Sequence, residues 1–146
     1  MYLEDLAPGQ QFSAGPVEVT AELIKRFALE YDPQPFHLDE QAADAHPIFG
    51  GLAASGWHTA ALTMRMVVDA IGHFGWGVVG GGGELLWLKP VRPGDTLRMV
   101  SEVLEVQPSK SRTDRGSVVM RNTTLNQQGE PVQTFTVKLL VPRRPA

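Results

Sequence analysis

Residues 55–72, SGWHTAALTMRMVVDAIG, carry the longest helical pattern of this chain. Apolar residues recur there at helical spacing, which places them on one wide face of an α-helix. The members of this apolar stripe are Trp57, Ala60, Ala61, Met64, Val67, Val68 and Ile71. Gly72 and Gly75 then break the pattern. A stripe of this width predicts a central helix that buries much of its surface.

The patterns on either side of this helix differ in kind. On the N-terminal side, Thr20 can cap a helix that continues to Tyr31, and a shorter helix can begin at Asp39 and run to Asp44. On the C-terminal side, apolar and polar residues alternate as they do in strands. The expected strands are 84–91, 97–106, 117–125 and 134–141, with a hairpin turn at 126–129 and an earlier strand around 12–19. Most of the expected helices come first in the chain and most of the antiparallel strands come last. This order predicts the α+β class, because a doubly wound parallel sheet would need strands and helices that alternate.

The composition fits a single globular domain over residues 1–146. Of the 146 residues, 42% are hydrophobic and 20% are charged, which are ordinary values for a chain that buries a core. The net charge of -3 gives no basic field that would attract nucleic acid or an anionic membrane. The absence of cysteine excludes disulfides, thiolate nucleophiles and cysteine metal sites. With no basic, apolar leader and no run near the ~18 apolar residues that cross a bilayer, a cytoplasmic protein is expected.

The segment at residues 31–39 joins a carboxylate and an imidazole across a stiff turn. Pro33 and Pro35 each fix their own φ and push the preceding residue out of the helical region. Asp32 and His37 are therefore expected on a pre-ordered loop. A histidine exchanges protons near neutral pH, and a neighbouring carboxylate can orient it or share a bound water with it. On its own, such a pair is more often a structural hydrogen bond than a catalytic one.

The spacing Asp32-x-Gln34-Pro35-x-His37 is similar to the D-x-N-P-x-H hydratase motif of the (R)-specific enoyl-CoA hydratases and MaoC-like dehydratases. Segments 2–9, 51–56 and 88–95 resemble the same family in the same order, so the resemblance covers nearly the whole chain. It implies the hotdog fold, a curved antiparallel sheet wrapped around a long central helix. It also implies a dimer or tandem domains with acyl-CoA bound between them.

The resemblance assigns three catalytic residues. Asp32 and His37 match the family's catalytic pair, and Gly56 matches the glycine whose backbone N–H polarises the thioester carbonyl. The position of Gly56 at the start of the long helix suits that role, because free N–H groups and the helix dipole favour a developing enolate oxygen there.

Several positions depart from the family pattern. Gln34 stands where asparagine is usual, Tyr31 where glycine is common, Phe36 where a smaller aliphatic is expected, and Ser55 where histidine often precedes the glycine. These departures bear on the substrate more than on the chemistry. Gln34, Phe36 and Ser55 are therefore expected in the substrate-binding site together with Trp57, and Phe36 and Trp57 can narrow the acyl pocket.

The function implied is that of a hydro-lyase, which adds water to or removes it from a 2-enoyl or 3-hydroxyacyl thioester, as in fatty acid metabolism. No cofactor or metal is required, because coenzyme A enters only as part of the acyl-CoA substrate. A homodimer or a dimer of dimers is expected, since the apolar stripe and the alternating strands exceed what one thin sheet on one helix covers.

Two other functions stay open. The first is a hotdog acyl-CoA thioesterase, but such enzymes commonly rely on an acidic residue within the central helix, where this chain has only Asp69 near the far end. The second is a non-catalytic acyl-CoA binding module, in which the departures at positions 31, 34 and 55 mark lost catalysis.

The remaining motifs favour structural roles. His58 is expected to be partly buried with a hydrogen bond to the backbone, and the four histidines lack the spacing of metal ligands. The run Gly80–Gly83 precedes an expected strand, whereas phosphate-binding loops precede a helix, so close backbone approach or flexibility explains it better. Lys110, Arg112 and Arg115 can meet the phosphates of coenzyme A or form a solvated cluster.

Overall fold

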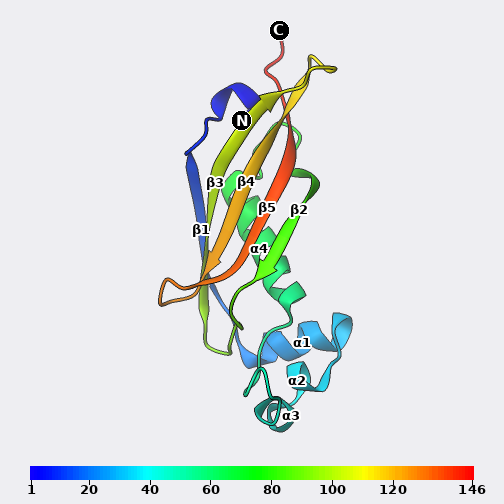
Figure 1. Ribbon diagram of the computed structural model, residues 1–146, viewed down its shortest axis with the longest axis vertical. Coiled ribbons are helices and arrows are strands. Elements are labelled where there is room, and N and C mark those ends of the chain that lie inside the picture. Colours follow the sequence, from blue (N-terminus) through cyan, green and yellow to red (C-terminus); the bar gives the residue numbers. More distant parts are fainter.

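The computed structural model describes all residues from 1 to 146 and shows one curved antiparallel sheet with a long helix against it (Figure 1). The strands are β1 (Gln11–Glu18), β2 (Val79–Trp87), β3 (Thr96–Pro108), β4 (Arg115–Leu125) and β5 (Pro131–Pro142). They are ordered β1-β3-β4-β5-β2, and every neighbouring pair is antiparallel. The helices are α1 (Ala21–Tyr31), α2 (Pro35–Leu38), α3 (Glu40–Asp44) and α4 (Gly56–Ile71), preceded by a 3-10 turn at Leu3–Asp5.

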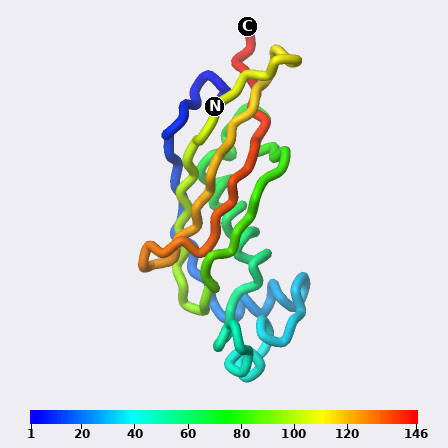
Figure 2. Tube along the Cα trace, viewed as in Figure 1, coloured from blue at the N-terminus to red at the C-terminus, as the bar shows by residue number.

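The elements are arranged as the hotdog fold requires. Helix α4 lies along one face of the sheet, while α1, α2 and α3 gather at one end of the molecule (Figure 1). The chain trace shows the strands bending together around α4 (Figure 2). The α+β class and the hotdog architecture expected from the sequence are therefore confirmed.

The core lies between α4 and the inward face of the sheet. Strand β4 shows the alternation clearly, because Val118, Met120, Asn122 and Thr124 are buried while their neighbours are not. Opposite them, α4 buries a row of side chains that is only partly the predicted apolar stripe. The buried helix residues are His58, Thr59, Thr63, Met66, Val67 and Ile71.

The apolar stripe predicted on α4 is wider than the face of the helix that the sheet covers. Met64 and Val68 are 44% and 45% exposed, and Trp57 is 61% exposed. Trp57 and Met64 lie where the sheet does not close over α4, because they line a cavity between this helix and the edge strand β2.

The glycine run differs from its sequence-based prediction. The strand expected at 84–91 begins at Val79, so Gly80–Gly83 lie inside β2 and pair with β5. A Cβ atom on Gly83 would lie 2.3 Å from the carbonyl oxygen of Thr136, which shows that close backbone approach requires glycine there. The strand ends at Trp87, after which the N–H groups of Leu88 and Lys89 both donate to the carbonyl of Val132, and Pro90 has no N–H with which to continue the pairing.

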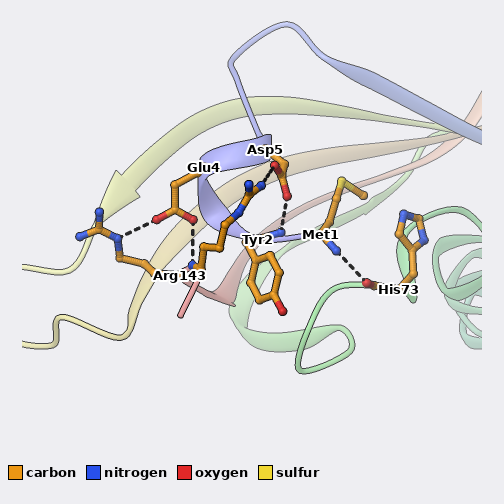
Figure 3. Close-up of polar contacts among 7 residues, drawn as sticks. Met1, Tyr2, Glu4, Asp5, His73 and Arg143 are labelled. Atoms are coloured by element: carbon orange, nitrogen blue, oxygen red, sulfur yellow. Dashed lines mark hydrogen bonds and ion pairs between the residues drawn. The ribbon is translucent and has the colours of Figure 1, made fainter. Parts of the chain in front are cut away.

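Polar contacts tie the two ends of the chain together, away from α1–α3 (Figure 3). Arg143 Nε donates to Glu4 Oε1 at 2.9 Å, and the N-terminal ammonium donates to the carbonyl of His73 at 3.0 Å. Hydrogen bonds from the Arg143 side chain and the Arg144 backbone lower the pKa of the exposed Glu4 carboxyl to about 2. These contacts hold the two ends of the chain in place beside the sheet, and we assign them a structural role.

Candidate active site

The join between α1 and α2 places Asp32 and His37 next to each other. Helix α1 ends at Tyr31, and the N–H of Asp32 still donates to the carbonyl of Ala28 at 2.9 Å. Pro35 then occupies the first position of α2, where its fixed φ suits a helix and its missing N–H costs nothing. The sequence predicted a loop over this segment. In the structure His37 lies on a short helix, and its side chain is buried.

The two side chains face each other across a short gap. His37 Nε2 lies 3.3 Å from Asp32 Oδ2, and His37 Nδ1 lies 2.7 Å from the carbonyl oxygen of Ala53. A carbonyl oxygen only accepts, so Nδ1 carries a proton and Nε2 of the neutral ring is an acceptor. An unprotonated Nε2 and an ionised Oδ2 repel each other unless a proton lies between them. The geometry therefore suits either a proton on Nε2 or a water that donates to both atoms.

The other oxygen of Asp32 is already occupied. Gln34 Nε2 donates to Asp32 Oδ1 at 2.6 Å. Burial raises the pKa of Asp32, but the hydrogen bonds from Gln34 and Ser55, together with the positive charge of His37 when its ring is protonated, outweigh burial and hold the pKa below its usual value. The carboxylate is thus ionised at neutral pH and presents Oδ2 to His37.

A fixed loop supplies the carbonyl that orients His37. Arg92 Nη1 donates to the carbonyls of Gly51 at 2.7 Å and Leu52 at 3.3 Å, and Nη2 donates to the carbonyl of Phe49. The loop therefore cannot move without breaking charge-assisted hydrogen bonds. Arg92 lies within the family-like segment 88–95, but its role could not be predicted from the sequence, because its partners are backbone carbonyls some forty positions away.

Gly56 begins α4, and its N–H has no hydrogen-bond partner in the chain. Ser55 caps the helix by accepting from the N–H of Trp57 at 3.2 Å. The indole of Trp87 lies directly against Gly56, where a Cβ atom would be 2.4 Å from Trp87 Cε2. Trp87 Nε1 also donates to the carbonyl of Gly56 at 3.0 Å. Only glycine fits under this indole.

One cavity brings His37 and Gly56 together. It has a volume of about 310 Å³, and Thr59 and Trp87 also line it. The rest of its wall consists of Phe49, Ala54, Leu88, Lys89, Pro90 and Val91. His37, which Asp32 contacts from behind, and the free N–H of Gly56 therefore meet at one cavity, and acyl chemistry at a carbonyl needs both a proton-exchanging group and an oxyanion donor.

The four residues that were predicted to bind substrate lie in different surroundings in the structure. Gln34 supports Asp32, and Ser55 is buried as the helix cap. Trp57 lines a second cavity, of about 500 Å³, between α4 and the sheet, and contacts Trp87 edge to face. Phe36 stacks on another aromatic ring, that of Phe49, and lines neither cavity.

The remaining candidates lie apart from the pair. His58 stacks on Phe27 with a ring separation of 4.7 Å, and its Nδ1 has no partner, so the expected backbone hydrogen bond at that atom is absent. Arg115, in the cluster with Lys110 and Arg112, pairs with Asp114 at 2.8 Å, at the end of the sheet opposite α1–α3 (Figure 1).

No three His, Asp or Glu side chains lie close enough together to hold a metal ion. No helix has both the length and the apolar character needed to cross a membrane.

Comparison with known proteins identifies the family. The MaoC like domain matches residues 5–127, and the chain belongs to this family. Its structure resembles the crystal structure of the MaoC-like dehydratase from Rhodospirillum rubrum, with a TM-score of 0.95 and 54% identity over 100% of this chain and 99% of that one.

Two sequence relatives add to this. The uncharacterized protein YdeM of Bacillus subtilis (strain 168) is 32% identical over 98% of this chain and 100% of its own length. Mesaconyl-CoA hydratase of Cereibacter sphaeroides is 43% identical over 58 residues, which are 40% of this chain and 17% of that protein.

Proposed function

We propose that this protein is a hydro-lyase that adds water to a 2-enoyl thioester of coenzyme A, or removes it from the 3-hydroxyacyl thioester. The observation that carries the proposal is the contact of His37 Nε2 with Asp32 Oδ2 at 3.3 Å, with Nδ1 held by the Ala53 carbonyl. Membership of the MaoC-like domain family supports hydratase or dehydratase chemistry. A hydratase named for a CoA thioester among the relatives supports the substrate class.

The proposed reaction uses the pair as one unit. A water held between Nε2 of His37 and Oδ2 of Asp32 loses a proton to the pair as its oxygen attacks the β-carbon. The electrons of the double bond move toward the thioester carbonyl, and the N–H of Gly56 stabilises the enolate oxygen. A proton is then delivered from the pair to the α-carbon, which completes the addition of water. The protons belong to the coupled pair and are not assigned to one residue at each step.

The structure gives less support to a thioesterase. The carboxylate of α4, Asp69, is exposed and pairs with Arg65 at 3.3 Å one helical turn away. It does not line the cavity that holds His37 and Gly56. Hydratase chemistry therefore fits the arrangement of the site better than thioesterase chemistry does.

We also propose that the protein acts as a homodimer. The exposed Trp57 and Met64 of α4 line a cavity with residues of strand β2, whose outer edge has no partner in the chain. A second copy placed on this face would cover the apolar side chains and the strand edge together.

A single assay separates the functions. The protein is incubated with a panel of 2-enoyl-CoA and saturated acyl-CoA esters, and loss of enoyl absorbance is followed separately from release of the coenzyme A thiol. The hydro-lyase proposal expects loss of enoyl absorbance without thiol release. Thiol release from the saturated esters would support a thioesterase instead, and binding without either reaction would support the non-catalytic module.

A further inference from the structure

The cavity between α4 and the sheet has an apolar wall and a polar floor. Its volume of about 500 Å³ is in the range of small-molecule sites. Most of its lining is apolar, as Met64, Val67 and Leu85 illustrate, whereas Thr63, Asn122 and Gln133 are polar and almost completely buried. A cavity shaped only for a hydrocarbon chain would be destabilised by buried polar groups without partners.

The hydrogen bonds around Thr63 fix the orientation of Gln133. Thr63 Oγ1 donates to the carbonyl of Thr59 at 2.9 Å, so it must accept from Thr124 Oγ1 at 2.6 Å and from Gln133 Nε2 at 3.0 Å. Gln133 Oε1 accepts from Trp87 Nε1 at 3.1 Å. This amide therefore cannot be turned over, and its second N–H is left without a partner.

Asn122 adds a second free donor on the neighbouring strand. Its side chain is 2% exposed, and its Oδ1 accepts the single hydroxyl proton of Ser101, because an amide oxygen is a stronger acceptor than the nearby Met99 Sδ. No group of the chain accepts from its Nδ2. This nitrogen is unpaired but not fully enclosed by the chain. Because Asn122 lines the cavity, we take the cavity to be what Nδ2 faces. The cavity thus has amide donors from β4 and β5 that lack acceptors.

This cavity adjoins the candidate active site. Trp87 joins the two, because its indole packs against Gly56 on the active-site side and its Nε1 also donates to Gln133 of the second cavity. Trp57, next in sequence to Gly56, lines the second cavity. An acyl chain whose thioester carbonyl is held at Gly56 would extend past these indoles.

On the basis of the proposed function, we propose that the acyl group of the substrate carries a neutral oxygen acceptor, a carbonyl or hydroxyl, which accepts hydrogen bonds from Asn122 Nδ2 and Gln133 Nε2. The acceptor must be neutral because no lysine, arginine or histidine lines the cavity. A buried carboxylate without a positive partner is costly. The substrate class is therefore an oxygen-bearing acyl thioester in place of a plain hydrocarbon one.

Calorimetric binding of saturated acyl-CoA esters tests this without requiring turnover. The probes are hexanoyl-CoA, 5-oxohexanoyl-CoA and glutaryl-CoA. Two hydrogen bonds of ordinary net strength predict that the wild type binds the keto ester roughly tenfold or more tightly than hexanoyl-CoA. Asn122→Leu should abolish or reverse this preference. Thr123→Val, on the outward side of the same strand, should leave it unchanged. Asn122→Asp keeps the shape of the side chain but replaces the donor with an acceptor, so it should also lose the preference for the keto ester. This variant replaces Asn122→Leu in the test if the leucine variant does not fold.

The outcomes separate this inference from the proposed function. Equal binding of the keto ester and hexanoyl-CoA would overturn the inference but not the hydro-lyase proposal. The same conclusion would follow if glutaryl-CoA bound most tightly of the three esters. A keto preference that depends on Asn122, in a protein without hydration activity, would support the inference and overturn the hydro-lyase proposal. Failure of all the esters to bind would overturn the inference and count against a CoA thioester as substrate.

Discussion

Replacing Gly56 with alanine tests the contact between the start of α4 and Trp87. The new methyl carbon would lie 2.4, 2.7 and 2.8 Å from three atoms of the indole. Restoring ordinary contact distances requires a movement of about 1 Å, but Trp87 is held by hydrogen bonds to Gly56 and Gln133. Overpacking of this kind costs about 1–3 kcal/mol, and here much of it can be relieved because Trp87 is 47% exposed.

The expected result is a larger loss of activity than of stability. A displacement near 1 Å at a site that positions a reacting carbonyl can cost about 100-fold in rate. We therefore predict that Gly56→Ala lowers kcat for enoyl-CoA hydration by about 100-fold and lowers Tm by a few degrees. Steady-state kinetics and thermal melts measure the two effects.

A second substitution tests whether the indole of Trp87 is the obstacle. Trp87→Leu removes the ring that the methyl group strikes, so Gly56→Ala should cost less in a Trp87→Leu background than in the wild type. Equal losses in both backgrounds would show that the indole is not the obstacle. Wild-type kcat and KM in Gly56→Ala alone would refute the role of this contact altogether.

Three further predictions concern the loop, the buried histidine and the assembly. Arg92→Met should lower kcat by roughly 10- to 100-fold with little change in KM, because the loop whose Ala53 carbonyl orients His37 loses charge-assisted hydrogen bonds worth about 1.5–3 kcal/mol each; unchanged kcat would refute this. Burial lowers the pKa of His58, and the charge of Arg26 acts in the same direction, so below about pH 6.5 the unfolded chain binds a proton that the folded chain does not. The free energy of unfolding should therefore decrease as pH falls from 6.5 toward 5, and denaturant titrations of His58→Phe should show a smaller decrease. Light scattering at micromolar concentration should give twice the mass of one chain, and the mass of a single chain would contradict the proposed dimer.

Local signals were sufficient to predict most of the helices and strands. Thr20 caps α1 by accepting from the N–H of Leu23 at 3.2 Å, and Asp39 caps α3 in the same way. The hairpin turn at 126–129 also lies where the sequence placed it. The short α2 was missed because a helix of four residues has no periodicity to detect. The start of β2 was missed because glycines have little strand propensity and their pairing with β5 decides the structure.

The site was predictable where a motif encodes it and unpredictable where distant backbone completes it. The spacing of Asp32 and His37 indicated a pair, and the structure brings them within 3.3 Å. The carbonyl of Ala53 that orients His37 is sixteen positions away, and no sequence pattern marks a carbonyl as an acceptor. Asn122 did leave a signal, since it interrupts the apolar side of an alternating strand at an inward position.

The proposed function requires that Asp32 and His37 act as one proton-transfer unit. Both residues lie at one site, and neither is expected to hold the coenzyme. His37→Ala and Asp32→Asn should therefore each reduce turnover of an enoyl-CoA by roughly two to four orders of magnitude, while calorimetric binding of a saturated acyl-CoA changes little. Circular dichroism and the mass from light scattering must be unchanged in each variant, because Asp32 also ends α1.

The most direct measurement is the turnover of the double variant beside the two single variants. If the pair acts on one water, removing either residue disables the unit, and the double variant should be scarcely slower than either single one. Fully additive losses would assign the two residues separate roles. Wild-type hydration by His37→Ala would contradict the account.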